Sequence, residues 1–103
     1  MLRELDKQGF EEAMRIVDKP VVVNFSTDWC PYCKQLAPII EEIAEEHADE
    51  IDVYYLDTDA HEDISDRFEV MTVPTVFVFI NGKAARSAVN PRTKAAVLKL
   101  IFN

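Results

Sequence analysis

The chain has 103 residues, of which 49% are hydrophobic, and it carries a net charge of −8. These values predict one domain over residues 1–103 with a single core, and the negative charge argues against nucleic acid or an anionic membrane as a main partner. The longest apolar run, Val73 to Ile80, is too short for the roughly 20 residues that cross a bilayer, and the N-terminal residues lack the apolar stretch of a secretory signal.

Hydrophobic periodicity divides the first half of the chain into alternating strands and helices. Apolar residues at every third or fourth position predict amphipathic helices, whereas β-branched or aromatic runs predict strands. The elements expected here, in chain order, are an edge strand at 2–5, a helix at 8–18 ended by Pro20, a central strand at 21–25, a helix that begins at the cysteines and is kinked at Pro38, and a strand within 51–57.

The second half predicts a short helix, a hairpin and a last helix. The Asn81-Gly82 pair is typical of a two-residue hairpin turn. The elements expected are a helix capped by Asp59 and ending near Phe68, antiparallel strands at 75–80 and 83–89, and a helix with Asn90 as its cap and Pro91 at its first position. The order βαβαβαββα predicts an α/β fold, with a mainly parallel sheet, a C-terminal antiparallel hairpin and helices on both faces.

The charge is unevenly distributed along the chain. Residues 81–103 contain five basic side chains and no acidic one, whereas the first 80 residues sum to −13. Two interpretations stay open: a solvated basic helix face, or a surface on which an acidic partner docks.

The two cysteines, Cys30 and Cys33, are separated only by Pro31 and Tyr32. A disulfide between them closes too short a loop to stabilise the fold much, so the pair is placed for chemistry. Cys30 directly follows the central strand at a helix N-terminus, where backbone amides favour a thiolate. We therefore expect Cys30 to be an exposed attacking thiol with a lowered pKa, and Cys33 to resolve the mixed disulfide that forms.

The cysteine pair has two other interpretations. A zinc site needs further ligands, but His47 and His61 are fourteen positions apart, whereas zinc-binding histidines are typically separated by three to five residues. An inert buried pair is disfavoured because the charged residues Asp28 and Lys34 flank the motif. No metal and no cofactor are expected.

These motifs together resemble the thioredoxin family, over nearly the whole chain. The resemblance is carried by Trp-Cys-x-x-Cys-Lys at 29–34, by Pro38 and by Val-Pro-Thr at 73–75. It implies the thioredoxin fold and a disulfide oxidoreductase that passes two electrons to protein disulfides. Cys30 corresponds to the family's nucleophile and Cys33 to its resolving thiol, and a Cys30–Cys33 disulfide is the oxidised form.

The resemblance also implies roles for the neighbouring residues. Pro74 matches the family's cis-proline, which faces the cysteines and lets the Val73 backbone pair with an extended substrate. The residues expected to bind substrate are Val73, Pro74, Thr75 and Trp29, and those expected to support the active site are Trp29, Asn24, Pro31, Tyr32 and Lys34.

The sequence departs from the family pattern at four places. The Pro31-Tyr32 dipeptide is typical of glutaredoxins, the family's Trp after the central strand is Ser26, and its Gly before the last helix is Asn90. The family's buried Asp is Asn24, and its nearby Lys is Tyr55. Because Asn24 cannot take up a proton, the usual base for the resolving cysteine is missing.

The function expected is that of a cytoplasmic protein-disulfide reductase. Its partners would be disulfide-containing client proteins and an electron donor of the thioredoxin-reductase type, and a monomer is expected. The alternatives are a glutathione-coupled, glutaredoxin-like reductase and a metal- or cluster-binding or redox-silent interaction module. Asn81-Gly82-Lys83 follows the strand after Pro74, as in thioredoxins, where a glutaredoxin would carry a Gly-Gly pair and an acid.

Overall fold

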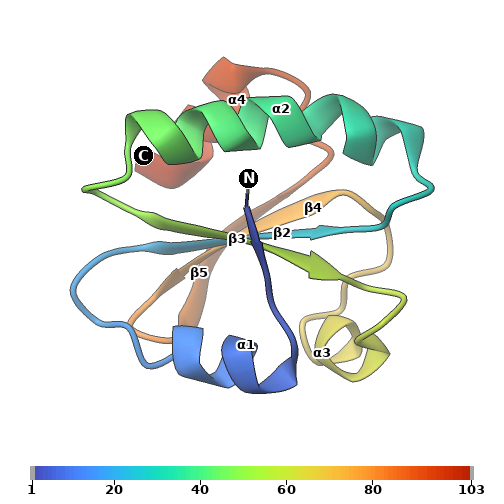
Figure 1. The fold of residues 1–103 in the computed structure, drawn as a ribbon, viewed down its shortest axis with the longest axis horizontal. Coiled ribbons are helices and arrows are strands. Elements are labelled where there is room, and N and C mark those ends of the chain that lie inside the picture. The colour runs from blue at the N-terminus through green and yellow to red at the C-terminus, as the bar shows by residue number, and fades with distance from the viewer. Residues whose placement is uncertain (1, 103) are drawn as a thin grey trace.

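The computed structural model describes residues 2–102, which form a five-stranded mixed sheet between two layers of helices (Figure 1). The elements are β1 (Arg3–Glu4), α1 (Lys7–Ala13), β2 (Val21–Ser26), α2 (Pro31–Glu46), β3 (Asp52–Asp57), α3 (Glu62–Arg67), β4 (Thr75–Ile80), β5 (Lys83–Val89) and α4 (Lys94–Phe102). No helix among these residues is long and apolar enough to cross a membrane.

The strand order is β1-β3-β2-β4-β5, which places β2 at the centre. β1, β3 and β2 run parallel, whereas β4 is antiparallel to both β2 and β5. The C-terminal ends of β2, β3 and β5 and the start of β4 therefore lie along one edge of the sheet. The predicted α/β class, the central strand and the antiparallel hairpin are confirmed.

Both faces of the sheet are covered, and the two cores differ in chemistry. α2 and α4 cover one face with aliphatic side chains, whereas α1 and α3 cover the other with a cluster of phenylalanines (Figure 1). Alternation along a strand distributes its residues between the two: Val22 of β2 packs under α2, and Val23 and Phe25 pack on the opposite side. Asn24 is two residues after Val22 on the same strand, so its side chain lies on the same face of the sheet and faces α2.

The first helix is shorter than predicted. α1 ends at Ala13, and the amides of Arg15 and Ile16 donate to carbonyls three residues earlier, which tightens the chain into a turn. Val17, which falls within the predicted helix at 8–18, lies beyond α1 and is 71% exposed. This turn packs on the β4–β5 hairpin so closely that a Cβ at Gly82 would lie 2.3 Å from the Met14 carbonyl oxygen.

The predicted cap of the third helix is also wrong. α3 begins at Glu62 with His61 at the N-cap position and no side-chain hydrogen bond there. Asp59 instead accepts a hydrogen bond from the indole Nε1 of Trp29, at 2.7 Å. A contact with a residue thirty positions away thus replaces the local one that sequence spacing indicated.

The last helix begins later than predicted. Asn90 has a φ of 47° and Pro91 precedes the helix, so neither has the predicted role. Thr93 caps α4 instead, because its hydroxyl oxygen accepts the amide of Ala96 at 3.1 Å. The Asn81-Gly82 turn is confirmed, with φ angles of 53° and 76°. Pro38 lies within α2 as predicted, and the kink expected there stays a prediction.

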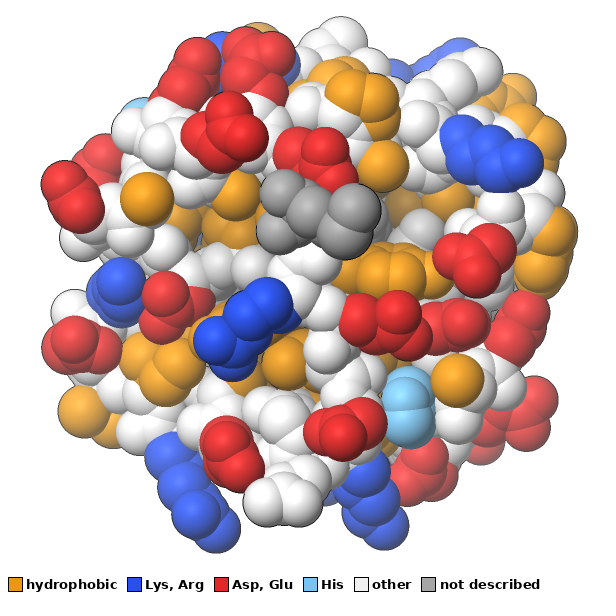
Figure 2. Space-filling model, in the orientation of Figure 1, with side chains coloured by type: hydrophobic (Ala, Val, Ile, Leu, Met, Phe, Trp, Pro, Cys, Tyr) orange, Lys and Arg blue, Asp and Glu red, His pale blue; other side chains and the backbone are white. Residues whose placement is uncertain are grey.

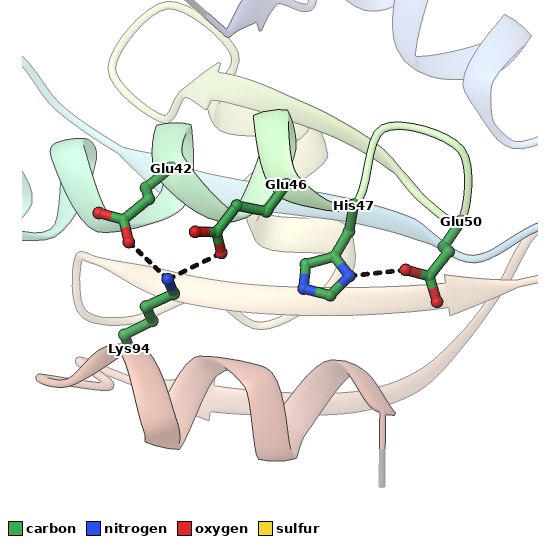
Figure 3. A network of polar contacts seen from close by, with 5 residues as sticks. All are labelled: Glu42, Glu46, His47, Glu50 and Lys94. Carbon is green, nitrogen blue, oxygen red and sulfur yellow. Dashed lines mark hydrogen bonds and ion pairs between the residues drawn. The ribbon is translucent and has the colours of Figure 1, made fainter.

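Two basic residues of the C-terminal segment hold α4 in place. The Lys94 ammonium lies between the carboxylates of Glu42 and Glu46 on α2 (Figure 3). The Arg86 guanidinium donates to the carbonyls of Leu100 and Ile101 at the end of α4, at 2.8 and 3.0 Å. Part of the positive charge of residues 81–103 is therefore used inside the fold.

Candidate active site

Cys30 and Cys33 lie at the sheet edge where β2 ends and α2 begins. Cys30 is the N-cap residue of α2, and its Sγ accepts a hydrogen bond from the backbone amide of Cys33 at 3.3 Å. Both cysteines are free thiols. Cys30 is 5% exposed and Cys33 is 2% exposed. The expectation that Cys30 is solvent-exposed is wrong, since its sulfur turns toward the Cys33 amide and lies 3.8 Å from the Val73 carbonyl oxygen.

The pKa of the Cys30 thiol lies below its ordinary value. Burial opposes the charged form and acts to raise the pKa, but hydrogen bonds to the sulfur outweigh it. They come from the Cys33 thiol, the Cys33 amide and the Tyr32 amide. The first turn of α2 therefore stabilises a thiolate at Cys30, as the sequence predicted.

The pKa of the Cys33 thiol is shifted in the opposite direction. Burial is the largest cause of the raised pKa, and the hydrogen bond that Cys33 donates to Cys30 adds to it. Hydrogen bonds from the Ser26 hydroxyl and the Thr27 amide act in the opposite sense but do not reverse the shift. Cys33 is therefore held as a protonated thiol beside a sulfur that ionises more readily.

The Val73–Pro74 peptide bond is cis, which confirms the expectation from the family resemblance. The Pro74 carbonyl accepts the Asn90 amide at 2.7 Å, and the buried Thr75 hydroxyl donates to the Thr72 carbonyl at 2.6 Å. These bonds fix the start of β4 opposite Cys30. The Val73 carbonyl places this segment beside Cys30, and the expected role of Val73, Pro74 and Thr75 in binding substrate stays a prediction.

Exposed apolar side chains lie along the sheet edge that carries the dithiol. Trp29 is 67% exposed and Met71 is 91% exposed, and Tyr32 and Val89 are also accessible. Such residues gathered at one edge are typical of a surface that contacts other proteins. Sequence reasoning identified Trp29 and Tyr32 but missed Met71 and Val89, since nothing local marks an apolar residue in a loop or on an edge strand as exposed.

Comparison with known proteins identifies the family of this chain. A family model described as Thioredoxin matches residues 1–103. A thioredoxin of Mycobacterium tuberculosis (strain H37Rv) is 39% identical over 82 residues, which cover 80% of this chain and 71% of that protein. Thioredoxins of Alicyclobacillus acidocaldarius and Rickettsia bellii are 34% and 31% identical, over 87% and 100% of this chain and 85% and 98% of theirs.

The chain belongs to the thioredoxin family. It is accordingly a thiol–disulfide oxidoreductase, and the two neighbouring thiols at the end of β2 are its redox-active pair.

The family's buried carboxylate is replaced by Asn24, which lies 2% exposed on β2. Its side chain lines a cavity of about 570 Å³ that also contacts Cys33, Thr27 and Lys34. Two buried oxygens at this cavity, Asn24 Oδ1 and Thr27 Oγ1, have no hydrogen-bond partner within residues 2–102. An unsatisfied buried oxygen costs about 1–3 kcal/mol, so each of these two atoms is a destabilising feature beside Cys33.

The family's lysine near that carboxylate is Tyr55, and it has a new partner. Its hydroxyl lines the same cavity and donates to the Asp28 carboxylate at 3.0 Å. Burial, followed by this hydrogen bond, raises the pKa of Tyr55 well above its usual range, so the group stays a donor. Sequence reasoning named Tyr55 as a departure but did not find its link to Asp28.

Neither histidine lines the cavity beside Cys33. His47 ends α2 and contacts Glu50 (Figure 3), and His61 precedes α3. Among residues 2–102, no three His, Cys, Asp or Glu side chains lie together as metal ligands would.

Proposed function

We propose that the protein reduces disulfides of client proteins through a Cys30/Cys33 dithiol–disulfide cycle. The observation that carries this is the opposite shift of the two pKa values across one helical turn. A lowered pKa makes Cys30 the nucleophile, and a raised pKa keeps Cys33 protonated until a mixed disulfide has formed.

The cycle balances as follows. The Cys30 thiolate attacks one sulfur of the client disulfide, a Cys30–client bond forms, and the other client sulfur leaves as a thiolate that takes up a proton. Cys33 then loses its proton and attacks the Cys30 sulfur, which forms the Cys30–Cys33 bond and releases the first client sulfur as a second thiolate. Two electrons pass to the client, and the protein is left as the disulfide.

The surrounding residues have supporting roles in this proposal. Pro31 opens α2 and removes a backbone donor, and Tyr32 completes the dipeptide between the sulfurs. Val73, Pro74 and Thr75, with Trp29, form the groove for an extended client. Lys34 and Asn24 line the cavity beside the resolving thiol.

The proton of Cys33 leaves through this cavity. Asn24 does not titrate near neutrality, so it cannot itself take the proton. Cys33 lines the cavity, and the cavity opens to solvent at its rim, so solvent that enters it takes the proton. The titratable and charged groups that line the cavity are Glu4 of β1, Asp28, Lys34 and Glu41 of α2, and Tyr55 of β3.

The reduced dithiol is regenerated by a reductase of the thioredoxin-reductase type. A "Bifunctional thioredoxin reductase/thioredoxin" of Mycobacterium leprae is 38% identical over 82 residues, which cover 80% of this chain and 18% of that protein. Its name supports such a donor for this chain. The cytoplasmic location and the monomeric state rest on the sequence argument alone and stay predictions.

Turnover of insulin disulfides tests the function. With dithiothreitol as reductant, we expect the wild type to accelerate reduction, and Cys30→Ser to abolish the acceleration. With a thioredoxin reductase and NADPH replacing dithiothreitol, turnover should continue, whereas glutathione alone should sustain little. Turnover sustained by glutathione alone would favour the glutaredoxin-like alternative, and failure with every reductant would contradict the proposal.

A further inference from the structure

Arg92 lies next to the active site, in the segment between β5 and α4. Its guanidinium carbon is 5.2 Å from the centroid of the Tyr32 ring. Both residues line a pocket of about 130 Å³ together with Asn90. Since Tyr32 lies between the two cysteines and the Asn90 amide bonds the Pro74 carbonyl, this pocket adjoins the groove at Cys30.

Arg92 is not used to hold the fold together. Two other cations of residues 81–103, Lys94 and Arg86, contact Glu42, Glu46 and the end of α4. Within the described part of the chain, the guanidinium of Arg92 has no carboxylate or carbonyl partner, and its one recorded contact is the Tyr32 ring. Its donors therefore remain available to a ligand.

The order of the strands places opposite charges on the two sides of Cys30. Asp28 follows β2 and Asp59 follows β3, which pairs with β2 on one side. Arg92 follows β5, on the other side of β2 beyond β4. Figure 2 shows acidic side chains next to hydrophobic ones on the right, the side on which β2 and β3 end in Figure 1.

The pocket is suited to a carboxylate. A guanidinium presents paired donors that match the two oxygens of a carboxylate, and a ring beneath it fixes its orientation. The side-chain amides of Gln35 and Asn90 line the same pocket and supply further donors. A pocket of about 130 Å³ suits the end of an Asp or Glu side chain better than an aromatic ring.

We propose that this pocket binds the carboxylate of an Asp or Glu of the client protein, about two residues from the client's reacting cysteine. Tyr32 is two residues from Cys30, which spans at most about 7 Å of extended chain, and an extended client covers the same distance with two residues. This inference rests on the proposed function, since it names a feature of the client. In this proposal the basic C-terminal segment attracts a client carboxylate at short range, whereas the net charge of −8 repels acidic clients at long range.

Disulfide peptides that differ at one position test the proposal. The residue two positions before, or two positions after, the reacting cysteine is Glu, Gln or Lys, and kcat/KM is measured with each. For one of the two placements, we expect the Glu peptide to react about 2- to 5-fold faster than the Gln peptide, the range of one exposed ion pair. The preference should vanish in 1 M salt, where the Debye length is about 3 Å.

Variants of the protein distinguish an effect of the pocket on this preference from an effect of the overall charge. Arg92→Gln should lower the Glu-to-Gln ratio to about one, and Arg92→Glu should favour the Lys peptide. Lys83→Gln makes the same charge change at the opposite edge of the sheet, where β5 begins, and should leave the ratio unchanged. A preference for Glu that survives in Arg92→Gln, or one that Lys83→Gln lowers equally, would overturn the inference. If the wild type reduced no peptide at all, the proposed function would fail instead.

Discussion

Cys30 and Cys33 lie within one turn of the same helix, yet their surroundings differ in kind. Cys30 lies at the helix end beside exposed aromatic side chains, and its sulfur accepts hydrogen bonds from the first turn. Cys33 lies inside the helix and lines a cavity with Asn24 and Thr27, whose side-chain oxygens lack partners among residues 2–102.

Burial alone does not set the roles of the two thiols. Both are almost fully buried, and desolvation acts to raise both pKa values. Only at Cys30 do hydrogen bonds outweigh it, because the Cys33 thiol donates to its sulfur and the N-cap position adds the amides of Cys33 and Tyr32. The position relative to the helix end, rather than accessibility, makes one sulfur the nucleophile.

The largest effect is expected when each thiol is removed in turn. Cys33→Ser keeps the attacking sulfur but removes the resolving one, so turnover should fall to background while mixed disulfides with clients accumulate. Cys30→Ser should also lose turnover but form no mixed disulfide. Mass spectrometry of the trapped species checks both variants. Equal amounts of mixed disulfide in the two would show that the thiols are interchangeable.

The next largest effect is expected for Asn24→Asp, which changes the surroundings of Cys33. A carboxylate there is buried where Asn24 Oδ1 has no hydrogen-bond partner among residues 2–102, so stability at pH 7 should fall by about 1–3 kcal/mol. Burial favours the protonated carboxyl, so the loss should shrink as pH falls and the group becomes neutral. The same carboxylate can accept the Cys33 proton, so resolution of the mixed disulfide should be faster near neutral pH.

Chemical denaturation and stopped-flow reduction of a disulfide substrate, both from pH 6 to 9, measure these two effects. Asn24→Leu is the control, because it removes the amide without adding a proton acceptor and should not speed resolution. Superimposable rate profiles for wild type and Asn24→Asp would limit Asn24 to a structural role.

The smallest change expected in stability concerns the cavity itself. The Thr27 hydroxyl oxygen is buried without a partner among residues 2–102, so Thr27→Val, which keeps the shape of the side chain, should leave the free energy of unfolding unchanged or raise it by up to about 1 kcal/mol. The hydroxyl is not part of the bonds that lower the pKa of Cys30, so the attack step should be unchanged. A loss of stability of about 1 kcal/mol or more, measured by chemical denaturation, would show that the hydroxyl makes a hydrogen bond and contradict this description of the site.

The sequence predicted the strands and the long helix well because their signals are local. The run at 21–25 is apolar on both faces, and the structure covers both faces of β2. The prediction failed where a distant contact replaced a local one. Asp59 bonds Trp29 instead of capping α3, and the turn after α1 packs on the hairpin at Gly82.

The site was predictable in its residues but not in its environment. The cysteine motif and Pro74 identified the reacting groups, and their spacing placed Cys30 at a helix start. The burial of Cys30, the cavity at Asn24 and the contact of Arg92 with Tyr32 arise where separate strands end at one edge. No spacing along the chain encodes such neighbours.

The most direct test of the account is the pH dependence of alkylation at each cysteine of the reduced wild-type protein. Iodoacetamide reacts with the thiolate, so the midpoint of each rate profile, followed by mass spectrometry of the peptides that carry Cys30 and Cys33, reports the pKa of that thiol. The account predicts a midpoint below the ordinary pKa of a cysteine thiol for Cys30 and above it for Cys33. Coincident midpoints, or a lower one for Cys33, would contradict it.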